Sequence, residues 1–167
     1  MSSPIKIKNV DKQKEITIGV ISDTHGFLRP QVAEKFADVD LILHAGDVGD
    51  PDILSDLQAV APLIAVRGNM DYGSWAERLP VVQSIQVGNH CILLIHDVGW
   101  IGRDIDLTNY QAVITGHTHR PLIELQDRRL YFNPGSAGHR RRHYPISVGK
   151  LFVRNGQLVP NLIELET

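Results

Sequence analysis

The sequence contains almost no cysteine and has almost no net charge. Cys91 is the single cysteine among 167 residues, so the chain cannot close an internal disulfide. It lies in the apolar run CILLI, which favours a small buried side chain. The formal charge of -2, from 17 basic and 19 acidic residues, gives no general attraction to nucleic acid. A sequence-independent DNA or RNA binder is therefore not expected.

Long hydrophobic runs are missing as well. No stretch approaches the roughly 20 apolar residues that a membrane span requires. The N-terminal MSSPIKIKNVDKQKE has no apolar core of signal-peptide length. We expect an intracellular, cytoplasmic protein without a membrane partner. With 43% hydrophobic and 22% charged residues, the composition is that of an ordinary globular protein with a sizeable core.

The first half of the chain alternates apolar strands with helices. Residues 1–14 are expected to form a polar arm or an edge strand, because PIKIKNV alternates apolar and charged positions. Residues 15–167 are expected to form one domain. The expected strands are 16–22, 40–46 and 62–68, and the segments 29–39 and 52–60 between them have helical composition. This order is typical of a parallel sheet with covered faces.

The second half is rich in hairpins. Two strands flank Gly88-Asn89, a further strand lies at 112–115, and two more hairpins follow, the last turning at Asn155-Gly156. The whole order predicts an α/β (α+β) domain in which two mixed sheets pack face to face with helices outside.

Polar residues of one kind fall where the expected strands end. They are Asp23, His25, Asp47, Asn69, His96, His117 and His119. Strand ends line the ligand crevice of open α/β sheets, so these side chains are expected to converge. Carboxylate, carboxamide and imidazole donors suit Mn, Fe, Ni or Zn. Seven ligands exceed the needs of one ion and suit two ions that share a carboxylate.

Each of these residues also has a simpler explanation. An Asp after a strand is usually a turn former or a helix N-cap, as we expect for Asp52 and Asp104. The His pair in ITGHTHRP is, by itself, equally typical of a surface loop. His44 and His90 are interpreted as structural, with His44 able to orient a ligand. The joint placement and the types of the seven residues favour the metal site.

The ordered motifs of the chain resemble the calcineurin-like metallophosphoesterases, and within them the small bacterial and archaeal phosphodiesterase branch. The motifs are DTHG (23–26), GDV (46–48), GNMD (68–71), IHD (95–97), GHTH (116–119) and NPGS (133–136). The resemblance implies a four-layer αββα sandwich with two metals at the strand ends. It also implies a phosphoesterase, with a phosphodiesterase acting on a small phosphate ester as the favoured form.

The resemblance also assigns roles to individual residues. Asp23, His25 and His119 would hold the first metal, and Asn69, His96 and His117 the second. Asp47 would bridge the two metals and hold a bridging hydroxide as the nucleophile. Manganese is the favoured ion, with nickel, iron or zinc as alternatives.

Two departures from the family pattern concern the leaving group and the pocket wall. Many members carry a His acid after GN, and the small branch often has Cys, whereas this chain has Met70, which cannot donate a proton. Protonation then falls to water or to Asp71, so Asp71 and Asn69 are the catalytic candidates, and activated esters should be cleaved far better than alkyl esters. The second departure is HDVGW, which keeps His96 but places Asp97 and Val98 where the family commonly has Gly-His.

A basic run, HRRRH at 139–143, follows the NPGS loop. Arginine matches phosphate oxygens bidentately, and a Gly-Ser loop can receive an anion. Arg140, Ser136 and Asn69 are therefore the predicted substrate contacts. A solvated charge cluster or an oligomer contact is the alternative for the arginines.

Two rival functions use the same fold. A non-catalytic scaffold is the first, because a eukaryotic retromer subunit resembles this fold, although it is associated with an eroded ligand set. A nuclease is the second, with Tyr72, Trp75 and Trp100 as possible stacking platforms. Edge strands in the C-terminal hairpins also suggest a homo-oligomer.

Overall fold

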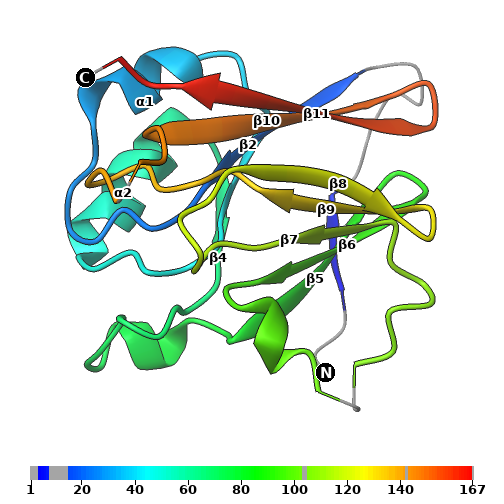
Figure 1. Ribbon diagram of the computed structural model, residues 1–167, viewed down its shortest axis with the longest axis horizontal. Coiled ribbons are helices and arrows are strands. Elements are labelled where there is room, and N and C mark those ends of the chain that lie inside the picture. The colour runs from blue at the N-terminus through cyan, green and yellow to red at the C-terminus, as the bar shows by residue number, and fades with distance from the viewer. Residues whose placement is uncertain (1–3, 8–14, 103–104, 142, 167) are drawn as a thin grey trace.

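Two β-sheets form the frame of the protein. The computed structural model describes residues 4–7, 15–102, 105–141 and 143–166. The five-stranded sheet has the order β11-β10-β2-β3-β4 and consists of β2 (Ile16–Ile21), β3 (Leu41–His44), β4 (Leu63–Ala65), β10 (Ser147–Arg154) and β11 (Gln157–Glu164). In Figure 1 this sheet lies above the second one.

The second sheet has six strands in the order β1-β5-β6-β7-β9-β8. They are β1 (Ile5–Ile7), β5 (Val82–Val87), β6 (His90–Ile95), β7 (Ala112–Ile114), β8 (Leu122–Gln126) and β9 (Arg129–Asn133). Both sheets are mixed: β2, β3 and β4 run parallel in one, and β6, β7 and β9 run parallel in the other. The remaining neighbours are antiparallel, except β1, which pairs in parallel with β5.

The N-terminal strand β1 lies within the first 14 residues, for which a polar arm or an edge strand was expected. Ile5–Ile7 forms the edge of the six-stranded sheet. Residues 1–3 and 8–14 lie outside the described residues.

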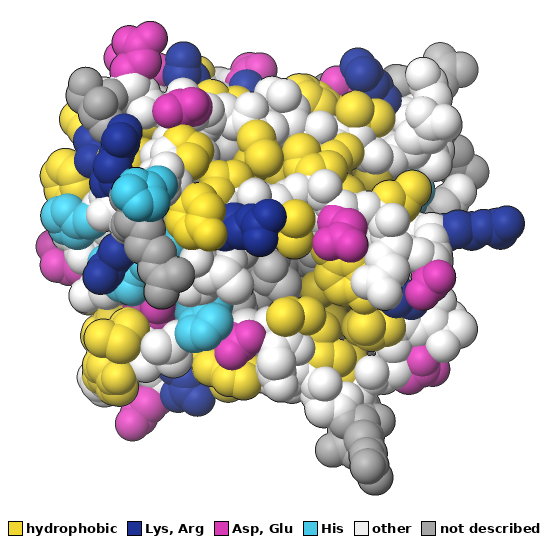
Figure 2. Space-filling view, viewed as in Figure 1, with side chains coloured by type: hydrophobic (Ala, Val, Ile, Leu, Met, Phe, Trp, Pro, Cys, Tyr) yellow, Lys and Arg dark blue, Asp and Glu magenta, His cyan; other side chains and the backbone are white. Residues whose placement is uncertain are grey.

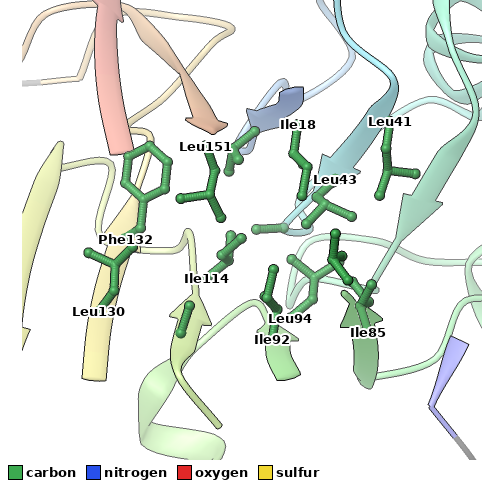
Figure 3. Close-up of a cluster of buried hydrophobic side chains, with 14 of the residues drawn as sticks. Ile18, Leu41, Leu43, Ile85, Ile92, Leu94, Ile114, Leu130, Phe132 and Leu151 are labelled. Carbon is green, nitrogen blue, oxygen red and sulfur yellow. The ribbon is translucent and has the colours of Figure 1, made fainter. Parts of the chain in front are cut away.

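The main core lies between the two sheets, as Figure 3 shows. Ile18 and Leu43 reach it from the five-stranded sheet, and Leu94, Ile114 and Phe132 reach it from the other. All five are fully buried. Alternate residues of a strand point to opposite faces, so β2 and β3 supply side chains to a second core as well. Strands buried on both faces need near-continuous apolar runs, which explains ITIGVI and LILH.

The second core lies between the five-stranded sheet and the two α-helices, α1 (Pro30–Lys35) and α2 (Pro51–Val60). Val32 and Phe36 at α1 and Ile53 and Leu57 of α2 are buried against it. Each helix begins at a proline, whose fixed φ suits the first turn, and the Asp50 side chain caps α2 by accepting from the Asp52 N–H. No described helix is long and apolar enough to cross a membrane.

The outer face of the six-stranded sheet has a thinner cover. Leu93, Ile95 and Val113 are buried there against Ile101, Leu107 and other side chains of the β6–β7 connection. Its helical part among the described residues is the 3-10 helix η2 (Val98–Trp100); the other 3-10 helix, η1 (Ala76–Arg78), follows β4. The predicted two-sheet α/β class is confirmed. In place of the predicted fourth, helical layer, the described residues of the β6–β7 connection form one 3-10 turn and irregular structure.

Candidate metal centre

The predicted ligands lie in tight turns that directly follow the strands. Five of them are non-glycine residues in the left-handed region: Asp23 (φ 56°), His25 (49°), Asp47 (54°), His117 (68°) and His119 (58°). Such residues are uncommon and cost on the order of 1–3 kcal/mol each, and they cluster at functional sites. The turns aim side chains from both sheets at one point. Figure 2 shows histidine side chains gathered at the left-hand end of the molecule, beside basic ones.

Backbone contacts lock these turns together. The N–H groups of Asp23 and His25 donate to the carbonyl oxygens of Gly46 and Asp47, at 3.0 Å each. Gly68 packs so closely on Asp47 that a Cβ there would lie 2.1 Å from Asp47 Oδ1, which only glycine permits. The DTHG, GDV and GNMD loops therefore form one rigid unit.

His44 connects the DTHG loop to the GDV loop, which is the structural role expected of it. The Gly46 N–H donates to His44 Nδ1 (3.2 Å), so the ring proton is on Nε2, 3.0 Å from Thr24 Oγ1. Thr24 in turn donates to the Val48 carbonyl (2.9 Å). Complete burial lowers the pKa of His44 to about 3, which keeps the ring neutral.

The first ligand group consists of Asp23, His25 and His119. Nε2 of His119 lies 3.3 Å from both Asp23 Oδ1 and His25 Nε2, and His25 Nε2 lies 3.8 Å from Asp23 Oδ1. Asp23 Oδ1 is buried and accepts no hydrogen bond from any described residue. Burial raises the pKa of Asp23 to about 7 and lowers the pKa of His119 to about 4. A neutral imidazole and an unsatisfied carboxylate oxygen aimed at one point fit a divalent cation.

The second ligand group surrounds Asn69. Its Oδ1 lies 3.0 Å from both His96 Nε2 and His117 Nδ1. His96 Nδ1 lies 2.7 Å from the carbonyl oxygen of Ala45, to which it donates, so Nε2 carries the lone pair when the ring is neutral. An amide oxygen and two imidazole nitrogens therefore face one another at the spacing expected around a shared cation.

Asp47 lies between the two groups. Its Oδ2 is 3.9 Å from His25 Nε2 and 3.4 Å from His96 Nε2, and its Oδ1 accepts the Met70 N–H at 2.7 Å. Burial opposes ionisation of Asp47, but the hydrogen bond and charge of His96 outweigh it and lower the pKa of Asp47. A carboxylate held in this position can serve cations on both sides.

Asp71, predicted as a possible acid, lies beneath the ligand loops and does not line the cavity. It is buried, and its two carboxylate oxygens accept the N–H groups of Gly49 and Gly68, both at 2.8 Å. Both oxygens act as acceptors for the loop backbone, and Asp71 is not among the residues that line the cavity above the ligands. These two hydrogen bonds connect the GDV loop to the GNMD loop.

Two predicted substrate contacts, Ser136 and Arg140, are not among the residues that line the cavity. Ser136 is buried, and its hydroxyl donates to the carbonyl oxygens of Asp23 and His139, at 3.0 and 3.2 Å. Arg140 is exposed but does not line the cavity, whereas its neighbour Arg141 does. Sequence spacing within a run of arginines gives no signal for which one turns inward.

A cavity of about 830 Å³ opens above the ligands. It is lined by the ligand residues His25, Asp47, Asn69, His117 and His119 and by Met70, Thr118, Arg141 and Tyr144. Of these, sequence reasoning missed Thr118 and Tyr144. The place of Thr118 between the two histidines of GHTH was the available signal for the first. Nothing in the sequence distinguishes Tyr144 from a core tyrosine.

The aromatic residues near the site have different environments. Trp75 packs against the core between sheet and helices, so it is not a stacking platform. The Trp100 ring lies 5.8 Å from the His96 ring, and Tyr72 is exposed with its hydroxyl 3.9 Å from Met70 Sδ.

Comparison with known proteins defines the class to which this site belongs. The chain matches the model of the calcineurin-like phosphoesterase superfamily domain over residues 16–156. The chain therefore belongs to the calcineurin-like phosphoesterase superfamily, as its motifs predicted.

Individual relatives agree with this assignment. A protein of Methanothermobacter thermautotrophicus named "probable metallophosphoesterase" is 40% identical over 135 residues, covering 71% of this chain and 76% of that one. A protein of the same name from Methanocaldococcus jannaschii is 38% identical, covering 71% and 67%. The fold is shared with a solved archaeal phosphodiesterase (TM-score 0.74, 23% identity, 90% and 100% covered). It is also shared with Vacuolar Protein Sorting 29 of Cryptosporidium parvum (TM-score 0.70, 19% identity, 92% and 99% covered).

Replacing Asp23 by Asn should have opposite effects on the metal-free and the metal-loaded protein. The pKa of Asp23 in the folded protein, about 7, exceeds its ordinary value of 3.8, so the metal-free wild type loses stability as pH rises through this range. We expect metal-free Asp23→Asn to be more stable than wild type at pH 8, by on the order of a few kcal/mol, and similar to it near pH 4.

Urea unfolding with and without Mn²⁺ measures this difference. Added Mn²⁺ should stabilise the wild type at pH 8 more than it stabilises Asp23→Asn, which keeps only the ligand group around Asn69 intact. Equal stability of the two metal-free proteins at pH 8 would contradict the burial of an uncompensated carboxylate.

Proposed function

We propose that the protein is a metal-dependent phosphodiesterase that holds two divalent cations and hydrolyses a small phosphate ester. The observation that supports it most is the position of Asp47, whose carboxylate lies between two groups of lone-pair donors. When bound, such cations would activate water and neutralise charge on the phosphoryl group. The mixed oxygen and imidazole donors favour Mn²⁺, with Ni²⁺, Fe²⁺ or Zn²⁺ as alternatives.

The cavity walls support a diester rather than a monoester. Arg141 offers one positive charge, and among the described residues no carboxylate forms an ion pair with it. Met70 and Tyr144 offer apolar surface on the same cavity. Among the described lining residues, the Arg141 guanidinium and the apolar walls suit a phosphate with a single charge and two organic substituents. The solved archaeal phosphodiesterase of the same fold is consistent with this choice.

The protein's own residues hold the ligand side chains in position for this reaction. His44, Asp71 and the interlocked loop backbone fix the ligand side chains before substrate arrives. Preorganisation of this kind avoids reorganisation during the reaction. The side chain of Met70, half exposed at the cavity, provides no proton for a leaving group.

Hydrolysis of bis-p-nitrophenyl phosphate and p-nitrophenyl phosphate tests the proposal. Metal-stripped protein should be inactive and should recover on addition of Mn²⁺, with the diester as the better substrate. Asp47→Ala and His117→Ala should each lower the rate at least 100-fold, because each removes a predicted metal ligand. Bound metal without turnover of either ester would instead favour the scaffold function suggested by the fold of Vacuolar Protein Sorting 29.

Arg141 should contact the substrate phosphate, and Arg140 provides a matched control. The positive charge of Arg141 contributes, after burial, to the lowered pKa of His25 and of His119, which indicates that it lies near the metal ligands. Arg141→Ala should reduce kcat/KM for the diester about 10- to 100-fold, the value of a charge-assisted hydrogen bond. Arg140→Ala should stay within twofold of wild type. Equal effects of the two substitutions would contradict the assignment.

Met70 should make the reaction strongly dependent on the leaving group. Among aryl phosphodiesters, rates of the wild type should fall steeply as the pKa of the departing phenol rises. Met70→His places an acid at the cavity and should raise the rate for the poorest leaving groups at least tenfold, since general acids contribute about 100-fold or more. Met70→Leu serves as the control and should follow the wild-type slope. A flat wild-type dependence would show that another group donates the proton.

A further inference from the structure

His117 is the most exposed of the four histidine ligands. Its side chain is 42% exposed, compared with 0% for His96 and about 15% for His25 and His119. Its backbone is fixed, because the His117 N–H donates to Asp23 Oδ2 at 3.1 Å. An exposed imidazole still rotates about its side-chain bonds unless a second contact holds the ring. The ring of His117 therefore needs a partner on the side away from Asn69.

Asp97 provides that contact. Its Oδ2 lies 3.5 Å from His117 Nε2, while His117 Nδ1 faces Asn69 Oδ1 at 3.0 Å. Among the described residues, no other carboxylate lies within 4.0 Å of the His117 ring nitrogens. The ring is thus placed between the carboxylate on one side and the ligand group on the other.

Asp97 is itself held in place. Its Oδ1 accepts the Gly99 N–H at 2.8 Å and caps η2, which leaves Oδ2 for His117. The residue directly follows His96, so the end of β6 supplies one ligand and the carboxylate that faces another. A carboxylate anchored by a helix cap can select one orientation of the neighbouring ring.

We infer that Asp97 is a positioning residue that accepts the Nε2 proton of His117 and so directs the Nδ1 lone pair toward the second cation site. Carboxylates that bind the outer nitrogen of a ligating imidazole fix its tautomer and orientation and raise its basicity. The inference rests on the proposed metal centre but not on its catalytic activity.

Calorimetric titration of the metal-stripped protein with Mn²⁺ tests this role without any measurement of turnover. Asp97→Ala should weaken the second equivalent of Mn²⁺ about 10- to 100-fold and leave the first nearly unchanged. Asp97→Ser keeps an oxygen that can cap η2 but is too short to reach His117, so it should lose as much affinity as Asp97→Ala. Asp97→Asn keeps an acceptor oxygen and should lose less.

A double-mutant cycle with His117→Ala separates this role from a general loss of structure. If Asp97 acts through His117, then adding Asp97→Ala to His117→Ala should produce no further loss of Mn²⁺ affinity. Additive losses would overturn the inference, as would wild-type affinity in Asp97→Ala or in Asp97→Ser. A wild-type protein that binds no Mn²⁺ would instead overturn the proposed function.

Discussion

The burial of two carboxylates at one end of the sandwich is the constraint on which the rest of the site depends. Asp23 and Asp47 are both buried, each just after a strand whose side chains belong to the apolar core. Removing a charge from water is costly unless an opposite charge compensates for it. Within the described protein, His96 offers partial compensation: burial opposes a positive charge on its ring, but Asp47 and Asp23 outweigh that effect and raise the pKa of His96. Bound cations would compensate both carboxylate charges fully, and the remaining ligands are arranged in two groups beside these carboxylates.

This arrangement needs a scaffold that can store backbone strain. Left-handed turns at ligand positions would relax if each loop were independent. The turns keep this conformation because the loops after β2, β3 and β4 hydrogen-bond to one another and to the side chains of Asp71 and His44. The packed apolar cores lie directly below these loops. Core packing thus supports the geometry of the site. The polar side chains below the ligands stabilise the loops and take no direct part in the proposed reaction.

Much of this could be predicted from the sequence. Apolar runs that end in Asp, Asn or His identify parallel strands and place their ends together, which is why all seven predicted ligands converge. The environments of Asp71, Ser136 and Arg140 could not be predicted, because the sequence does not show whether a polar side chain faces the cavity, bonds to a distant backbone group or faces solvent. The orientation of Asp97 toward His117 likewise could not be predicted, because it depends on a contact between residues 20 positions apart in the sequence.

Anomalous diffraction from crystals grown with Mn²⁺ would test the central claim most directly. The account predicts two peaks about 3.5–4 Å apart, with the Asp47 carboxylate between them. Asp23, His25 and His119 should surround one peak, and Asn69, His96 and His117 the other. A single peak beside Asp23, or two peaks that do not share Asp47, would contradict the claim that one buried carboxylate organises both cation sites.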